Sequence, residues 1–240
     1  MASTASDYKR APATASRFAG FPAAALTFFR GLDRNNNREW FQARKQVFEE
    51  QVKAPMTALV EAINAELARF APSYLTDARE AIFRIYRDTR FSADKRPYKT
   101  QIAAAFRRRG MEKHAGGALY FSVSHKQIEV AGGVYMPGPE QLLSIRNRLA
   151  ERHVEFRRLL ADRRLRSLMG ELAGDRLTRV PKGFPADHPA EELLRGKQWY
   201  FYVLLDARLA STPKILPDLL GRFRAVLPVV EFLNAPLGRS

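Results

Sequence analysis

Apolar residues in the first third of the chain recur every three or four positions, which is the spacing of an amphipathic helix. This pattern predicts one helix over residues 21–32 and a second over 33–52. Asn36 or Asn37 precedes the apolar residues of the second helix, and either can cap it, because the asparagine side chain accepts a hydrogen bond from a free backbone N–H. The chain therefore begins with a pair of helices.

The helical pattern then continues with one interruption. Pro55 lies inside the next apolar stripe, and proline breaks a helix outside its first turn. We therefore expect a break near Lys53 and a new helix over 55–70. Helical spacing returns over 140–172, where it predicts two or three helices, and over 213–233, where it predicts a closing helix.

Between these helices the apolar period changes to two residues. Alternating residues rich in isoleucine, phenylalanine, tyrosine and threonine predict a strand over 81–91, and residues 197–209 predict another. Residues 101–110 fit a helix or a strand, and pairing with the neighbouring strands favours a strand. Residues 117–140 predict two more strands, joined by a tight turn at His125–Lys126. Groups of strands next to groups of helices are typical of an α+β fold. We expect a single α+β domain, with a mainly antiparallel sheet of about five strands packed with N-terminal, middle and C-terminal helices.

The ends and the composition of the chain give less information about the fold. Residues 1–17 are rich in alanine, serine and threonine, so we expect a disordered tail before a single domain over 18–240. The chain has no cysteine, which excludes disulfides and thiolate metal sites and suits a reducing, cytoplasmic setting. No apolar run reaches the roughly 20 residues that span a bilayer.

The charge balance is less ordinary. The chain carries 40 lysines and arginines against 25 acidic residues, a formal net charge of +15. Such a surface attracts anions, and an anionic small molecule or a nucleic acid is a possible partner. Many basic enzymes have similar surfaces, so the net charge alone identifies no partner.

The densest group of charges is RIYRDTRFSADKRPYK, residues 84–99. In a strand, Arg84, Asp88 and Arg90 share one face, where successive positions lie about 6.5–7 Å apart. The arginines can therefore reach Asp88 and hold it ionised. A turn then brings Asp94, Lys95 and Lys99 back beside this strand.

Two interpretations of this motif stand side by side. Arginine side chains bind phosphate or carboxylate through two parallel hydrogen bonds, and lysine adds a point charge, so the surplus of cations fits an anion-binding site. The same residues also fit a structural ladder of ion pairs on a solvated sheet. Spacing alone does not separate these interpretations.

The motif also resembles the signature of a family of bacterial and fungal proteins catalogued as domain of unknown function two-four-six-one. The signature positions are filled by Arg84, Arg87, Asp88, Arg90, Phe91, Asp94, Lys95 and Tyr98. The segments NNNREWF, AGGVYMP, IRNRL and VPKGFPADHPAEELLRGK are similar to the family as well, and together they cover most of residues 18–206. The resemblance implies a single α+β domain. It implies no activity.

Two further segments have candidate chemistry. Lys182, Asp187 and His188 lie in a proline-rich loop, where the histidine can transfer protons or where Asp187 can begin the next helix as a cap. The helical region 146–166 carries eight arginines and three acidic residues, which fits either a nucleic-acid surface or an ordinary solvated helix face. The four histidines have no paired ligand spacing, so no metal site is expected, although carboxylates alone can hold Mg²⁺.

These observations lead to three functional hypotheses, and none of them names a cofactor or an oligomeric state. The first is an anion-binding domain with the ligand-binding residues Arg84, Arg87, Arg90, Asp94, Lys95, Tyr98, Lys99 and Lys182. The second is an enzyme of phosphoester or nucleotide chemistry at the same site, with Asp88 or His188 as general acid or base. The third is a non-specific nucleic-acid binder that uses the arginine-rich helices.

Overall fold

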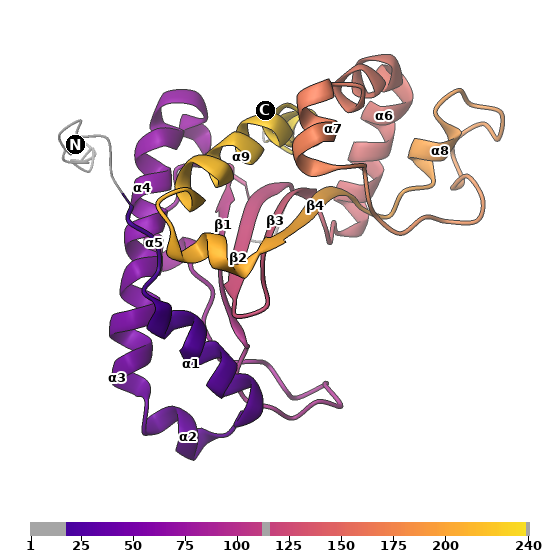
Figure 1. Ribbon diagram of the computed structural model, residues 1–240. Coiled ribbons are helices and arrows are strands. Elements are labelled where there is room, and N and C mark those ends of the chain that lie inside the picture. The colour runs from indigo at the N-terminus through magenta and orange to yellow at the C-terminus, as the bar shows by residue number, and fades with distance from the viewer. Residues whose placement is uncertain (1–17, 112–115, 239–240) are drawn as a thin grey trace, which may run out of the picture.

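The structure is a computed structural model that describes residues 18–111 and 116–238. The tail predicted over 1–17 lies outside these residues. The described chain forms one α+β domain, as predicted: a single sheet with helices packed on one of its faces and around its ends (Figure 1). No helix in the described ranges is both long and apolar enough to cross a membrane.

The sheet is antiparallel and has the strand order β1-β2-β3-β4. Its strands are β1 (Gln101–Arg107), β2 (Ala118–Ser124), β3 (Gln127–Val134) and β4 (Trp199–Asp206). The predicted turn at His125–Lys126 joins β2 to β3, and the late strand returns to pair with β3, as the sequence indicated. The described sheet therefore has four strands, where about five were predicted.

The predicted strand over 81–91 is the one that is wrong. Its first residue ends α5 (Ala78–Ala81), and the following residues pair with β1 only at an isolated bridge from Ile82 to Ala104, where Phe83 N–H donates to the carbonyl of Ala103. The rest of the segment pairs with residues 97–99 instead. Alternation along a chain is the same whether a segment joins a sheet or folds back on itself, so the pattern could not separate the two.

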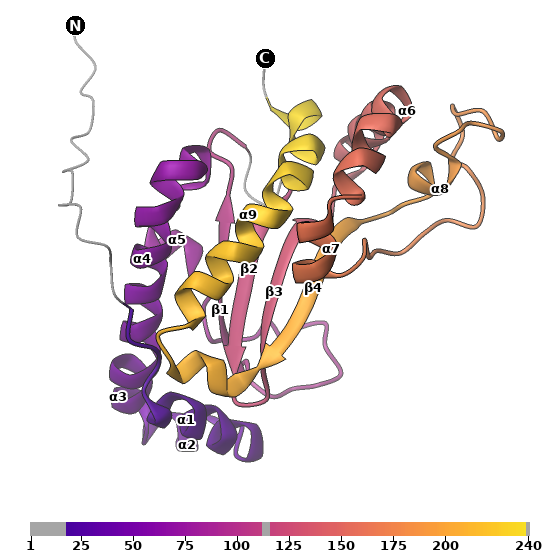
Figure 2. The ribbon, with the colours of Figure 1, turned by 45° about the horizontal axis from the view of Figure 1, so that its top comes forward.

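One face of the sheet is covered by α9 (Ile215–Asn234), which crosses the strands diagonally (Figure 2). Phe106 of β1 meets Phe223 of α9 edge to face, with ring centroids 5.9 Å apart, within the range of about 4.5–7 Å that aromatic pairs prefer. Gly132 of β3 lies so close to α9 that a Cβ atom there would come within 2.5 Å of Val226. Of the two glycines in AGGVYMP, Gly132 therefore serves close packing of the helix on the sheet, whereas Gly133 has a φ of 133° and lies against Trp199 and Tyr200 of β4.

The N-terminal helices pack beside the β1 edge. They are α1 (Ala23–Arg34), α2 (Arg38–Gln42), α3 (Lys45–Val47), the π-helical turn η1 (Phe48–Lys53) and α4 (Ala54–Phe70). Asn37 caps α2 by accepting a hydrogen bond from Trp40 N, 2.9 Å away. The predicted break at Lys53 is wrong, because the π turn carries the helix through to Pro55: Ala54 N–H donates to the carbonyl of Glu49, five residues back. The wider turn accommodates the proline ring without ending the helix.

The remaining helices complete the domain. They are α6 (Pro139–Leu160), which is kinked at Arg152, α7 (Arg163–Met169) and α8 (Glu191–Leu194), with the 3₁₀ turns η2 (Pro72–Tyr74), η3 (Ala207–Ser211) and η4 (Ala235–Leu237). The prediction of two or three helices over 140–172 is confirmed by α6 and α7. In Figures 1 and 2, α6, α7 and α8 gather at one end of the sheet, and residues 82–99 project from the other.

Candidate functional site

Residues 82–99 form a narrow arm that folds back on itself. Arg87 N–H donates to the carbonyl of Pro97 at 2.9 Å, and Lys99 N–H donates to the carbonyl of Ile85 at 2.8 Å. Tyr86 and Tyr98 form the bridge between these two bonds. The backbone pairing ends there, so the tip of the arm is held by side chains.

The first of these side-chain contacts belongs to Asp88. Its two carboxylate oxygens accept hydrogen bonds from Nε and Nη2 of Arg90 at 3.0 and 2.8 Å, and Oδ1 also accepts from the backbone N–H of Arg90. These hydrogen bonds lower the pKa of Asp88 to about 2. A carboxylate with so low a pKa is a weak base near neutrality, so the geometry gives little support to Asp88 as a general base.

Asp94 is held in a similar way, by two arginines. Arg96 donates to it through Nε and Nη2, and Arg87 Nη1 lies 2.6 Å from Oδ2. The hydrogen bonds from Arg96, and then those from Arg87, hold the pKa of Asp94 well below its usual range. Lys95 Nζ donates to the carbonyl of Thr89 at 3.0 Å across the arm. The charged tip is thus a set of internal pairs, with both carboxylates neutralised by neighbouring arginines.

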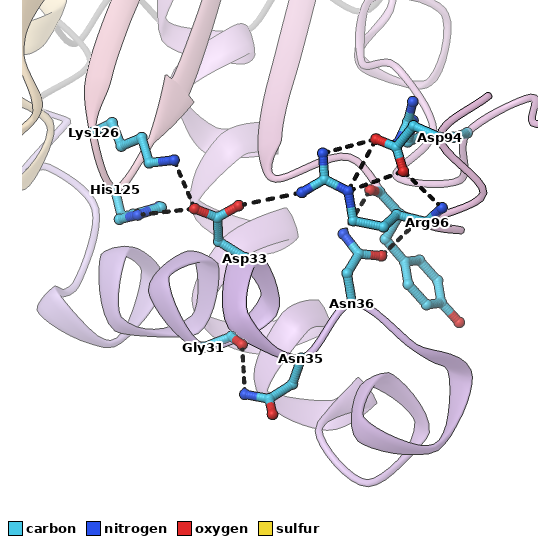
Figure 3. Close-up of polar contacts among 10 residues, drawn as sticks. Gly31, Asp33, Asn35, Asn36, Asp94, Arg96, His125 and Lys126 are labelled. Carbon is cyan, nitrogen blue, oxygen red and sulfur yellow. Dashed lines mark hydrogen bonds and ion pairs between the residues drawn. The ribbon is translucent and has the colours of Figure 1, made fainter. Parts of the chain in front are cut away.

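The arm is tied to the rest of the domain through Asp33, at the end of α1 (Figure 3). Lys126 Nζ lies 2.7 Å from Asp33 Oδ2, and Arg96 Nη1 lies 3.7 Å from Oδ1. His125 Nε2 is 3.6 Å from the same carboxylate. The hydrogen bond from Lys126 is the main cause of the lowered pKa of Asp33. One carboxylate therefore joins α1, the β2–β3 turn and the arm.

A second anchor comes from Asn36, whose amide bonds the arm backbone (Figure 3). Its Nδ2 donates to the carbonyl of Tyr98 at 2.9 Å, and its Oδ1 accepts from Tyr98 N–H at 3.0 Å. The Tyr98 ring is 2% exposed and stacks on Phe41 of α2, with centroids 4.1 Å apart. Tyr98, predicted as a ligand-binding residue, is placed here as a packing residue. These contacts join the segment NNNREWF to the charged motif.

The base of the arm lies against the face of the sheet opposite α9. The strand register aligns Ala103, Ser122 and Glu129 in one row across this face, and Ala105, Tyr120 and Ala131 in the next. Four of these six side chains are alanine or serine, and Tyr120 and Glu129 are the two large ones. Phe83 of the arm covers the β1 side of this surface and meets Tyr120 edge to face, with centroids 6.2 Å apart.

Two cations lie beside the Phe83 ring. Lys99 Nζ is 5.3 Å from the ring centroid, and the Arg107 guanidinium carbon is 5.6 Å from it. Both side chains are half-buried, and neither forms an ion pair with any described residue. Burial lowers the pKa of Arg107, and burial together with the charge of Arg84 lowers the pKa of Lys99. Arg84 likewise has no ion pair within the described ranges.

Polar side chains lie on the same face of the sheet as Arg107. Gln101 Nε2 lies 3.5 Å from the Tyr120 hydroxyl, at the limit of a hydrogen bond. Burial raises the pKa of Tyr120, and the nearby charge of Glu129 adds to this effect. Burial also raises the pKa of Glu129, which has no cationic partner among the described residues. We call Arg84, Lys99 and Arg107 with Gln101 and Tyr120 the sheet-face cluster.

The sheet-face cluster can stabilise an anion. Lys99 and Arg107 are half-buried and lose hydration, and the charge of the exposed Arg84 acts on Lys99. A bound phosphate or carboxylate would offset these costs. Arginine supplies parallel donors to such a group, and the tyrosine hydroxyl and glutamine amide can donate further hydrogen bonds. In the described parts of the chain, no group of three or more metal-ligating side chains was found.

The second predicted segment lies elsewhere. Lys182 is exposed, and His188 Nδ1 accepts a hydrogen bond from Ala190 N–H at 3.0 Å, just before α8. The histidine thus caps this turn, a role that the sequence assigned to Asp187. The segment before α8 and the arm lie at opposite ends of the sheet (Figures 1 and 2). No hydrogen bond or ion pair within the described ranges joins them, so the geometry does not bring Lys182 or His188 to the arm.

The structure thus divides the predicted residues into groups. Arg84 and Lys99 lie together in the sheet-face cluster. Arg87, Arg90, Asp88, Asp94 and Lys95 hold the tip of the arm together. Arg107, Tyr120, Gln101 and Glu129 were missed, because their relation to the motif depends on strand register. The alternation of small and large residues in QIAAAF and ALYFSVS was the available signal.

The comparisons with known proteins give a family and no activity. No curated protein and no solved structure matches the chain. The family model described as "Conserved hypothetical protein (DUF2461)" matches residues 24–232, which includes the N-terminal helices, the arm, the whole sheet and most of α9. The chain therefore belongs to the DUF2461 family of conserved hypothetical proteins.

Proposed function

We propose that this protein is an anion-binding domain and that its ligand presents a phosphate or carboxylate group to Arg84, Lys99 and Arg107. The observation that carries the proposal is the position of Lys99 and Arg107, two half-buried cations beside one ring with no carboxylate partner in the described chain. Burying a charge without a partner is unfavourable, and such groups with shifted pKa values are common at functional sites.

The rest of the motif has a different role in this proposal. Arg87, Arg90, Asp88 and Asp94 neutralise one another at the tip, and this pairing supports a scaffold role for them. The scaffold fixes the two ends of the arm, which carry Arg84 and Lys99. Both interpretations of the charged segment thus apply, each to a different part of it.

Calorimetric titration with pyrophosphate tests the proposal. Lys99→Met and Arg107→Met each remove charged hydrogen-bond donors, so each variant should weaken binding by roughly 10- to 100-fold. Lys182→Met is the matched control, because Lys182 is exposed and remote, and it should bind as the wild type does. Unchanged affinity in both cluster variants contradicts the proposal.

Thermal unfolding of the same variants separates a binding role from a structural one. Lys99 is destabilised by burial, so Lys99→Met should keep or raise the melting temperature while it weakens binding. If Lys99→Met instead lowers the melting temperature strongly and binds pyrophosphate normally, the lysine supports the fold and not the ligand.

A second candidate function is phosphoester chemistry at the same site, and Glu129 favours it. Its raised pKa and its place near Tyr120 suit a proton donor or acceptor. A screen of phosphomonoester and nucleotide hydrolysis, with and without Mg²⁺, tests this candidate. Activity should then be lost in Glu129→Gln while pyrophosphate binding remains. Activity that survives Glu129→Gln excludes this role.

The nucleic-acid hypothesis receives less support from the arginine-rich helices. Arg146 is buried and donates to the carbonyl of Gly196 at 2.8 Å, and Arg148 stacks over Phe232. Arg157 bonds the carbonyl of Pro189 and the Glu192 carboxylate. Several of the eight arginines thus serve the fold. Binding to DNA that weakens steeply with salt would support the nucleic-acid hypothesis. The cytoplasmic setting stays a prediction.

A further inference from the structure

A pocket of about 580 Å³ lies between the N-terminal helices and the beginning of the arm. Its inner wall is apolar and includes Phe41, Phe48, Ile82, Ile85 and Ile102. Four of these five side chains are buried, and Ile82 is partly buried. The volume falls within the range of about 300–1,000 Å³ that holds small ligands.

The π-helical turn η1 (Phe48–Lys53) shapes one side of this pocket, since both its first and its last residue line it. In a regular α-helix, residues five apart lie about 140° apart around the axis. The wider π turn reduces this separation, so the Phe48 ring and the Lys53 side chain can border the same space. Single π turns of this kind are frequent at functional sites.

The rim of the pocket is positively charged. Lys45, Lys53, Arg79 and Arg84 line it together with one acidic residue, Glu49. Glu49 is paired with Lys53 at 2.7 Å. Lys45, Arg79 and Arg84 form no ion pair with any described residue. The rim therefore presents three uncompensated cations next to an apolar wall.

We propose that this pocket binds a small amphipathic anion, a carboxylate or phosphate monoester carrying an alkyl or aryl tail. The tail lies against Phe41, Phe48 and Ile85, and the charged head meets Lys45 and Arg79. Apolar surface without a charged rim would favour a neutral ligand, and a charged rim without the apolar wall would favour an inorganic ion. The combination selects a ligand that has both parts. This site shares Arg84 with the sheet-face cluster, and its other lining residues are separate from that cluster.

Calorimetric titration of the full chain with hexanoate, octanoate and decanoate, each below its micelle concentration, tests the proposal. Every methylene group that enters the pocket should tighten binding by about fourfold. Decanol, which has the same tail without the charge, should bind at least tenfold more weakly than decanoate. Affinity that does not depend on tail length, or binding that occurs only above the micelle concentration, overturns the proposal.

Two substitutions locate the site. Thr57→Trp places a large ring in the pocket that Thr57 lines, and it should weaken decanoate binding at least tenfold. Ala58→Trp is the matched control, since Ala58 is the next residue of α4 and is exposed outside the pocket. Equal affinity in the two variants overturns the proposal.

A variant with surface substitutions only tests the same site in case Thr57→Trp does not fold. The double variant Lys45→Gln/Arg79→Gln changes only exposed side chains, and it should remove most of the preference for decanoate over decanol. A preserved preference contradicts the assigned head position. Lys99→Met should leave decanoate binding unchanged and weaken pyrophosphate binding, so failure at one site is distinguishable from failure at the other.

Discussion

The three consecutive asparagines at positions 35–37 have three different structural roles, and an alanine scan can separate them. Asn35 Nδ2 donates to the carbonyl of Gly31 on the exposed end of α1. Asn36 makes two hydrogen bonds to the backbone of Tyr98, 62 residues away. Asn37 caps α2. Asn36, the middle residue, should therefore contribute most to the stability of the fold.

The magnitudes follow from these contacts. Asn36→Ala removes two partly buried hydrogen bonds and leaves both backbone groups of Tyr98 without their partner, so it should cost about 2–3 kcal/mol of unfolding free energy. Asn37→Ala removes one helix cap and should cost about 1 kcal/mol. Asn35→Ala removes one exposed bond and should cost less than about 0.5 kcal/mol.

Urea unfolding followed by tryptophan fluorescence measures all three values under one protocol. The denaturant midpoint should shift while the slope stays constant. In thermal unfolding, a chain of this size loses roughly 2–4 °C per kcal/mol, so Asn36→Ala should melt about 4–12 °C lower. If Asn36→Ala lowers the free energy of unfolding no more than Asn35→Ala does, the hydrogen bonds between Asn36 and Tyr98 do not stabilise the fold, and the prediction is refuted.

Three further predictions concern the packing and titration of the same framework. Gly132→Ala should lower the free energy of unfolding by about 1–3 kcal/mol, because the new methyl group crowds Val226. The double variant with Val226→Ala should be at least ~1 kcal/mol more stable than the sum of the single changes predicts, and strict additivity would contradict the close approach of α9. Because the folded pKa of Asp88 is lowered to about 2, its stabilising contribution is complete above about pH 4 and is lost as the pH falls toward 2. The NMR shift of the Arg90 amide should titrate in that window, and a midpoint near pH 4 would contradict the ion pair between Asp88 and Arg90. Because the pKa of Lys99 is lowered, pyrophosphate binding should weaken as the pH rises through that pKa. In Lys99→Arg the decline should move to higher pH, and an identical pH profile in the wild type and this variant would exclude Lys99 from the site.

Much of the architecture could be predicted from local patterns. The β2–β3 hairpin, the late strand β4 and the closing helix α9 each have a clear period and clear end signals, and each was predicted close to its observed position. A cap at Asn36 or Asn37 also follows from local chemistry, and the structure shows that Asn37 is the cap. These features depend on residues near one another in the sequence, which is the information that a single sequence carries.

The arm and the site depend on contacts between distant residues. Whether 82–91 pairs with β1 or with 97–99 is decided by anchors such as Asn36 and Asp33, which no local pattern links to the motif. In the arm, Asp88 and Asp94 also accept hydrogen bonds from backbone N–H groups two residues on, which competes with regular strand pairing. Arg107 reaches the Phe83 ring only because the strand register places both above one face of the sheet.

The most direct test of the proposed anion site is a crystal structure of the protein grown with sodium tungstate, a tetrahedral dianion that is located by its anomalous scattering. If the proposal is right, a tungstate peak lies within hydrogen-bond distance of both Lys99 Nζ and the Arg107 guanidinium, with Tyr120 or Gln101 as a further donor. A structure whose tungstate peaks lie only at other surface cations, with Lys99 and Arg107 still unpaired beside Phe83, would contradict it.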